Sequence, residues 1–245
     1  MRSVLMAGLI MVISPVYLLC EDWSQTNVQY LYGNDFDYLA DGDRSTDGEM
    51  ETITIEHIGT WKYGSNFFFI DMASGDFASG RKYSIYAEWA PKISLSKLSE
   101  TDMQWGPVKD VSIVGEINQG NDFRAYNIGL GLALAVPGFN FFDLHLYHRK
   151  DNYNDATFQI TTAWNSTFEI GAVPLIFEGF FDYYGTDFGT EIVSQPRLLL
   201  DGKVFGDTTK NLQAGVELYY YKSSAAPWRR SVNEAVPQIM VKWIW

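Results

Sequence analysis

Apolar and polar residues alternate along most of this chain. Near its C-terminus, Ile239, Val241 and Trp243 alternate with Met240 and Lys242. Alternation with a period of two places successive side chains on opposite faces of a β-strand. Residues 235–245 are therefore predicted to form a strand with one apolar face. Such a strand suits the last position of a closed barrel, where it pairs with the first strand and removes both open edges.

The same alternation recurs in eleven earlier segments, so we expect twelve strands. Residues 34–51 carry seven acidic residues among glycines and are predicted to be a long polar loop. We find no helical stretch in the pattern. An even number of strands predicts an all-β fold, a single 12-stranded antiparallel transmembrane β-barrel. The eleven earlier segments are 23–32, 52–61, 67–72, 83–89, 111–118, 126–134, 142–149, 157–164, 175–183, 195–200 and 212–221.

The N-terminal segment 1–20 has the features of a secretory signal peptide. Arg2 supplies a positive start, 4–13 an apolar core, and Ser14 with Pro15 a break before the cleavage region. We therefore divide the chain into a signal peptide, 1–20, and an outer-membrane β-barrel, 21–245. The alternatives are an anchoring helix and lipidation of Cys20, the single cysteine.

Alternation alone does not say whether the apolar face points into a soluble core or outward to lipid. The export signal, the aromatic last strand and strands of about 9 to 11 residues favour the membrane, because that length crosses a bilayer. We expect the bacterial outer membrane, with its lipid and lipopolysaccharide as neighbours. A secreted soluble β-protein is the alternative.

Composition narrows the function further. The chain has 8 Trp, 15 Tyr and 16 Phe, more aromatics than a core of this size needs. Aromatic side chains gather at membrane interfaces and stack on flat ligands in pores. The net charge of −12 argues against a nucleic-acid polymer as a partner, since phosphate backbones attract basic surfaces. Single nucleosides remain compatible with this charge.

A family resemblance is carried by the segment PKISLSKLSETDMQWGPVKDVSIVGEIN, residues 91–118. It resembles the strand, periplasmic turn and strand of the nucleoside-specific channel-forming outer-membrane proteins, the Tsx-like and OmpK-like family. Two weaker similarities are Phe67, Phe69 and Asp71, where the family often has Tyr, Tyr and Asp, and GFFDY at 179–183. The matching residues of the main motif are Pro91, Lys92, Ser94, Leu95, Leu98, Ser99, Asp102, Met103, Trp105, Gly106 and Pro107.

The resemblance implies a monomeric 12-stranded barrel with a narrow lumen, through which nucleosides diffuse passively past aromatic and ionisable side chains. Some family members also serve as phage receptors, through extracellular loops. This chain departs from the Tyr-rich version at Phe67 and Phe69, which removes two hydroxyl donors.

A barrel of twelve strands is narrow enough for a small solute to touch its wall. We expect inward aromatics to stack on the solute, inward acids to accept hydrogen bonds from its hydroxyl groups, and inward bases to balance the acids. The alternative is that these side chains fill the lumen with ion pairs. The expected pore-lining residues are Phe67, Phe69, Asp71, Tyr86, Glu88, Glu116, Tyr147, Arg149, Asp182, Arg197, Glu217, Tyr219 and Lys242.

Other functions have weaker support. A structural or surface-receptor barrel, for phage or adhesion, would have a closed lumen. An outer-membrane enzyme is less favoured, because His145 and His148 have opposite strand parity and no hydrolase or phosphate-loop motif is present. The acidic stretch from Asp41 faintly resembles a calcium loop but has Thr46 where the turn glycine belongs. We expect no enzyme activity, no cofactor and no metal site.

Overall fold

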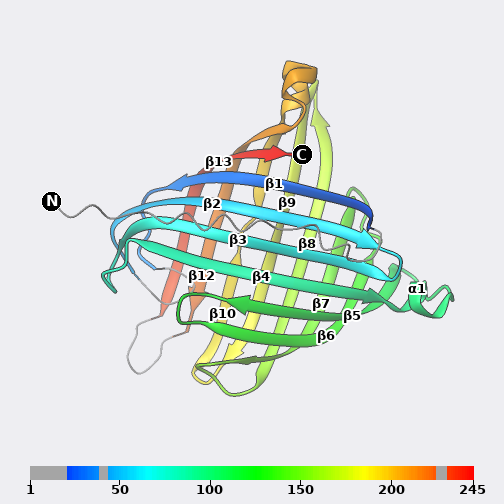
Figure 1. Ribbon diagram of the computed structural model, residues 1–245, viewed down its shortest axis with the longest axis horizontal. Coiled ribbons are helices and arrows are strands. Elements are labelled where there is room, and N and C mark those ends of the chain that lie inside the picture. The colour runs from blue at the N-terminus through cyan, green and yellow to red at the C-terminus, as the bar shows by residue number, and fades with distance from the viewer. Residues whose placement is uncertain (1–20, 39–43, 225–230) are drawn as a thin grey trace, which may run out of the picture.

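The computed structural model describes residues 21–38, 44–224 and 231–245, and these form a β-barrel (Figure 1). The predicted signal peptide, 1–20, lies outside the described residues. The strands are β1 Glu21–Gly33, β2 Ser45–Trp61, β3 Gly64–Phe77, β4 Tyr83–Ser94, β5 Val108–Gln119, β6 Arg124–Leu134, β7 Phe141–Asp151, β8 Thr157–Ile170, β9 Val173–Thr186, β10 Gly189–Ser194, β11 Arg197–Asp201, β12 Leu212–Ser223 and β13 Val232–Ile244.

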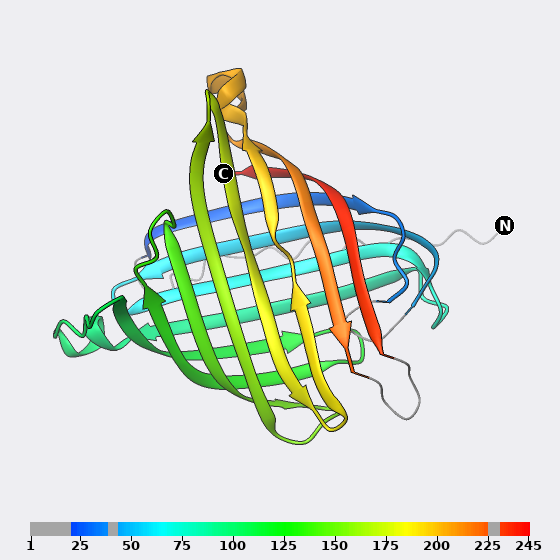
Figure 2. The same cartoon turned by 180° about the vertical axis from the view of Figure 1, so that it is seen from behind.

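Apart from β10 and β11, each strand pairs antiparallel with the next strand in the chain, and β13 closes the sheet onto β1. At the closure, Tyr30 lies opposite Val241 and Gly33 lies opposite Gln238. Strands β10 and β11 both pair with β9 and with β12, so they are two parts of one strand position (Figure 2). The barrel therefore has twelve strand positions, as the alternation predicts.

The barrel has two unlike ends. The connections β2–β3, β4–β5, β6–β7, β8–β9 and β11–β12 gather at one end, which we call the turn end. It carries helix α1, Leu95–Ser99, and the short 3-10 helices η1, Gly202–Phe205, and η2, Asp207–Thr209 (Figure 1). The opposite end, the loop end, carries the connections β1–β2, β3–β4, β5–β6, β7–β8, β9–β10 and β12–β13.

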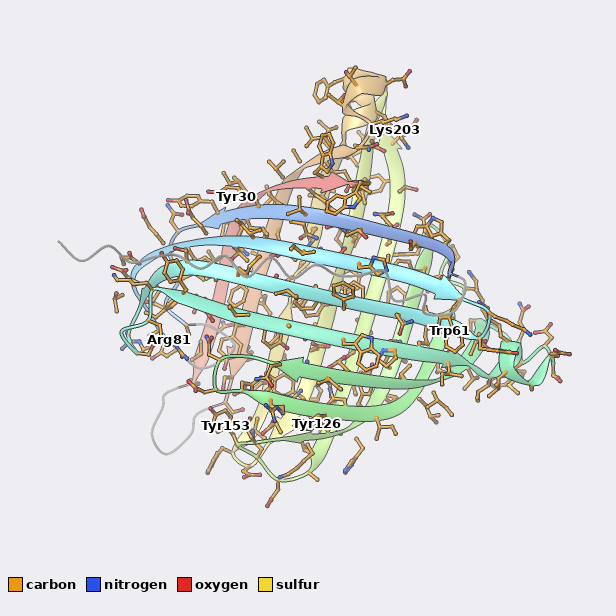
Figure 3. All side chains as sticks on the ribbon, viewed as in Figure 1. Tyr30, Trp61, Arg81, Tyr126, Tyr153 and Lys203 are labelled. Carbon is orange, nitrogen blue, oxygen red and sulfur yellow. The ribbon has the colours of Figure 1, made fainter. Side chains whose placement is uncertain are left out.

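The outer face of the barrel is apolar, as the alternation requires for a wall facing lipid. Ile53, Ile128 and Ile239 are exposed on three separate strands. Tyrosines flank this surface toward the loop end, among them Tyr30 and Tyr126 (Figure 3). Tyrosine rings suit the boundary between hydrocarbon and water. No helix in the described part of the chain is long and apolar enough to cross a membrane.

Three local predictions were wrong. Residues Ser45–Glu51 belong to β2 and not to a loop, because this stretch continues the pairing with β3 across an irregularity between Ser45 and Met50. The connection after β4 contains helix α1, where the Ser94 hydroxyl accepts a hydrogen bond from the Lys97 amide and caps the first turn. The tenth strand also begins earlier than expected, at Gly189.

Candidate functional site

All thirteen predicted pore-lining residues lie on the inner face of the barrel. Their burial differs around the wall. On β12 and β13, Glu217, Tyr219 and Lys242 are almost fully covered. The predicted residues on β3 and β4 keep partial exposure. Glu116 on β5 and Tyr147 and Arg149 on β7 are covered to a similar degree. The interior is therefore asymmetric, packed beside β5, β7, β12 and β13 and partly accessible to solvent along β3 and β4.

The packed region beside β12 and β13 holds an ion-pair cluster that extends across the lumen to β2. Arg197 Nε donates to Glu217 Oε2 at 2.6 Å, and its guanidinium lies 3.4 Å from Glu56 and 3.8 Å from Glu178. Lys242 Nζ donates to Glu178 Oε1 at 2.7 Å. These five residues come from β2, β9, β11, β12 and β13. The cluster therefore joins four successive strands to β2, which lies beyond β1 in the sheet.

A second polar cluster follows the inner wall from β4 to β9. Asn118 Nδ2 donates to Glu88 at 2.8 Å and to Glu116 at 3.1 Å. Gln159 connects Glu116 with Thr161, whose hydroxyl donates to Asp182 at 2.6 Å. Amide and hydroxyl groups thus bridge the three carboxylates of this wall.

Aromatic side chains line a path from the loop end into the lumen. The rings are spaced with centroids 6.0, 5.9, 6.4 and 6.4 Å apart, in the order Phe67, Phe69, Tyr86, Phe123 and Tyr153. We call these five residues the aromatic row. Tyr153 is exposed in the loop between β7 and β8 (Figure 3), so the row begins at the surface. A flat solute has a continuous series of ring contacts along this path.

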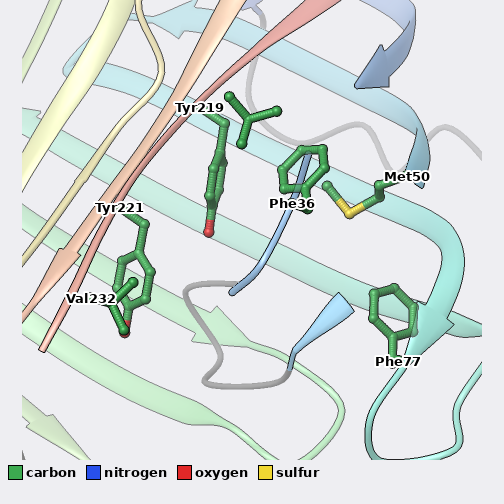
Figure 4. Close-up of a cluster of buried hydrophobic side chains, with 7 residues drawn as sticks. Phe36, Met50, Phe77, Tyr219, Tyr221 and Val232 are labelled. Atoms are coloured by element: carbon green, nitrogen blue, oxygen red, sulfur yellow. The ribbon is translucent and has the colours of Figure 1, made fainter. Parts of the chain in front are cut away.

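The opposite part of the loop end is covered. Phe36, from the segment after β1, is 2% exposed and packs on Tyr219 with ring centroids 5.4 Å apart. Met50 lies on the other side of Phe36 from Tyr219, and Phe77 and Tyr221 belong to the same buried cluster (Figure 4). Tyr219 is thus a packing partner of Phe36 and offers no open ring face for a solute. The prediction that it stacks on the solute is not supported by this arrangement.

Two further predicted residues take specific positions. The guanidinium of Arg149 lies 4.2 Å from the Tyr184 ring centroid and 5.6 Å from that of Phe123. The Tyr147 hydroxyl lies 3.1 Å from His145 Nδ1 on the inner face. His148 is exposed on the outer face, so the two histidines point to opposite sides, as their parity predicts.

Several functional candidates were absent from the predicted set. Glu56 and Glu178 have the correct inward parity, so strand alternation was sufficient to find them. Phe123 and Tyr153 sit in connections, where no alternation marks the inner side. Asn118 and Gln159 point inward as well. Amides like these are recognised as candidates only when one asks which side chains donate hydrogen bonds to the inward carboxylates.

The arrangement permits contact with a small solute. Within the described residues, no cluster of three or more His, Cys, Asp or Glu side chains is placed to hold a metal ion. Asp41 and Asp43 of the calcium-loop hypothesis lie outside the described residues. The accessible wall offers ring faces and hydrogen-bond acceptors side by side, which is chemistry for weak binding of a passing molecule.

Comparison with known proteins gives a partial sequence match and a shared fold. No protein-family model matches the chain. Over 116 residues it is 31% identical to the outer membrane protein OmpK of Vibrio parahaemolyticus, and this match covers 44% of the chain and 43% of the relative. The match thus spans less than half of either protein.

Among solved structures, the KdgM porin aligns with a TM-score of 0.50 and 11% identity, over 89% of this chain and 98% of the porin. The KdgM porin in complex with disordered oligogalacturonate aligns with a TM-score of 0.49 and the same identity and coverage. At such low identity the likeness is one of fold. With its closed barrel and apolar outer face, the protein is an outer-membrane β-barrel of porin-like fold.

Proposed function

We propose that the protein is a channel for passive, contact-selective diffusion of nucleosides or similar small solutes across the outer membrane. The observation that carries the proposal is the aromatic row, which leads from exposed Tyr153 to Phe67 inside the lumen. Base stacking on an aromatic ring contributes roughly 1 to 3 kcal/mol. Contacts of this size slow a solute without trapping it, as passage requires.

The partners of the aromatic row support a polar and flat solute. Glu88 and Asp71 lie beside the rings of Tyr86 and Phe69, and carboxylates accept hydrogen bonds from hydroxyl and amino groups. The partial match to OmpK and the porin-like fold support transport as the general function. The proposal of nucleosides as the solute is supported by the family resemblance of residues 91–118, by the rings and by these acceptors.

The test is single-channel conductance of the purified protein in a planar bilayer. Adenosine and thymidine are titrated against glucose and a free amino acid as controls. We expect saturable block by the nucleosides alone. If nucleosides do not change the conductance, the channel function would stand and nucleosides would be rejected as its solutes.

A structural or surface-receptor barrel is the second candidate. The ion-pair cluster favours it, since Glu217 is 1% exposed and Arg197 reaches across the lumen to Glu56. In that case phage or another surface would contact the loop end, with lipopolysaccharide around the barrel. Heat-dependent migration in gel electrophoresis is used to check that the protein is folded. If folded protein gives no conductance, the result would favour this candidate over the channel.

A further inference from the structure

Four carboxylates on the inner wall have no ion pair among the described residues. They are Asp71, Glu88, Glu116 and Asp182, and their hydrogen-bond partners are neutral. Asp71 accepts from the Thr54 hydroxyl at 2.5 Å. The three carboxylates of the ion-pair cluster, by contrast, share two cations. Of the four, Glu116 is buried and the other three are partly exposed. A carboxylate without a cation beside it is unfavourable in its charged form, so a cation that enters the lumen would stabilise that form.

Neighbouring amides add further acceptors. Asn118 and Asn127 are 3% and 5% exposed, and both direct Nδ2 to Glu116. Their Oδ1 atoms have no hydrogen-bond partner among the described residues. An amide oxygen accepts and cannot donate. The wall therefore holds two unpartnered acceptors beside Glu116, both covered by the surrounding side chains.

Rings and carboxylates alternate where β3 and β4 meet. In the strand register, Phe69 lies opposite Glu88 and Tyr86 lies opposite Asp71. The two rings have centroids 5.9 Å apart. We call these four residues the acid–aromatic block. A cation over a ring face is attracted by the ring electrons, and a carboxylate beside it adds a charge-assisted hydrogen bond.

One cationic side chain of the protein already lies beside aromatic rings and a carboxylate. The Arg149 guanidinium lies between Tyr184 and Phe123, and its Nε is 3.4 Å from Asp151. Phe123 is the ring next to Tyr86 in the aromatic row, at 6.4 Å. The Arg149 guanidinium, with rings and a carboxylate around it, thus lies one ring away from the acid–aromatic block. Within the block itself, no cation of the described residues forms an ion pair with Glu88 or Asp71.

We propose that the acid–aromatic block binds organic cations, small solutes that carry an ammonium or guanidinium group on a flat or apolar body. The proposal rests on the proposed channel function and narrows its solute class, because a cation with a flat face uses both the rings and the carboxylates. The described residues contain no metal-binding cluster, and the rings suit an organic cation.

The experiment compares three probes of nearly equal shape and different charge: benzylammonium, benzyl alcohol and benzoate. Equilibrium binding to the purified full barrel in detergent is measured by calorimetry, and current block by the same probes is measured in a bilayer. We expect benzylammonium to bind about tenfold more tightly than benzyl alcohol, with benzoate weakest.

Two variants place the site. Glu88→Gln and Asp71→Asn keep shape and remove charge, so each should abolish most of the preference for benzylammonium while benzyl alcohol binding stays within about twofold. The matched control is Glu169→Gln, an exposed acid at the turn end outside the lumen. It should leave all three affinities unchanged.

The outcomes separate this proposal from the channel function. Equal binding of benzylammonium and benzyl alcohol, or a preference untouched by both Glu88→Gln and Asp71→Asn, would overturn the cation site even if nucleosides block current. Cation binding that depends on Glu88 in a protein without conductance would uphold the site and reject the channel.

Discussion

Arg197 and Glu217 are direct partners in the register of β11 and β12, and Arg197 Nε donates to Glu217 Oε2 at 2.6 Å. Arg197 is equally the register partner of Glu178 on β9. A single guanidinium therefore stands between carboxylates on both neighbouring strands and reaches Glu56 on β2 as well. Its removal would leave covered acids with Lys242 as the remaining cation of the cluster.

Arg197→Ala should destabilise the barrel by about 3 kcal/mol or more, because breaking a buried ion pair leaves uncompensated charge. Urea unfolding in lipid vesicles, followed by tryptophan fluorescence, measures the loss. Lys203→Ala is the control, since this exposed lysine at the turn end lies 3.7 Å from Asp201 and should have no measurable effect. Equal stability of the two variants would contradict the structural role of the cluster.

The aromatic row gives a prediction for solute contact. Phe69→Ala should weaken nucleoside block of the current by about tenfold, because one stacking surface of roughly 1 to 3 kcal/mol is lost. Titration of single-channel current with adenosine measures the change. Phe205→Ala removes an exposed ring from η1, outside the lumen, and should leave the block unchanged. Undiminished block in Phe69→Ala would exclude the row as the contact path.

The cover over the loop end gives a prediction for conductance. Glu234 accepts hydrogen bonds from the backbone N–H groups of Asp37 at 2.9 Å and Tyr38 at 2.7 Å, which holds Phe36 against Tyr219. Glu234→Ala should release this segment and raise single-channel conductance.

Phe36→Ala should raise the conductance in the same way and cost about 3 kcal/mol of stability, since it leaves a cavity in the cluster. Asp76→Asn, at the same end outside the cover, is the control for both variants. Conductance at the wild-type value in both would mean that the cover does not limit passage.

The sequence predicts the faces of the strands better than the contacts between them. The alternation of Ile53 with Thr54 is sufficient to separate the two faces of the strand, because a wall between lipid and lumen imposes period two. The export signal, the aromatic last strand and the strand length are needed to say which face points outward. The segment 189–194 lacks this signal, since Ile192 and Val193 are adjacent and apolar. Pro196 then has no N–H for the ladder, so the tenth strand position is divided there.

The candidate site shows a similar limit. Inward parity identifies Glu88, Asp71 and Arg197 individually, but Arg197 and Glu56 are 141 residues apart and meet only through barrel closure. Phe36 and Phe123 lie in connections and carry no periodic signal. The ion pairs depend on strand register, and the covering of the loop end depends on the path of its loops. The order of residue types in the sequence determines neither.

The outer face gives a prediction for the membrane. Ile239 is 62% exposed near the middle of β13 and should face hydrocarbon. Ile239→Lys should cost roughly 2 to 4 kcal/mol, as cations do near the midplane of a barrel. Asn233→Lys has the same outward parity at the loop end of the strand and should cost about 1 kcal/mol or less. The free energy of unfolding in lipid vesicles is measured for both variants. Equal losses in the two would contradict a lipid-facing position for Ile239.

Close approach of β6 and β7 requires glycine at one position. A Cβ built on Gly129 would lie 1.9 Å from the carbonyl oxygen of Leu146 and 2.9 Å from the Cα of Tyr147, and neither backbone atom is free to move. Gly129→Ala should therefore separate the two strands and lower the unfolding midpoint. On neighbouring β5, a Cβ on Gly115 would meet Pro91 at an ordinary 3.6 Å. Gly115→Ala should fold normally, and if Gly129→Ala unfolded at the same urea concentration as this control, the close packing of β6 on β7 would be refuted.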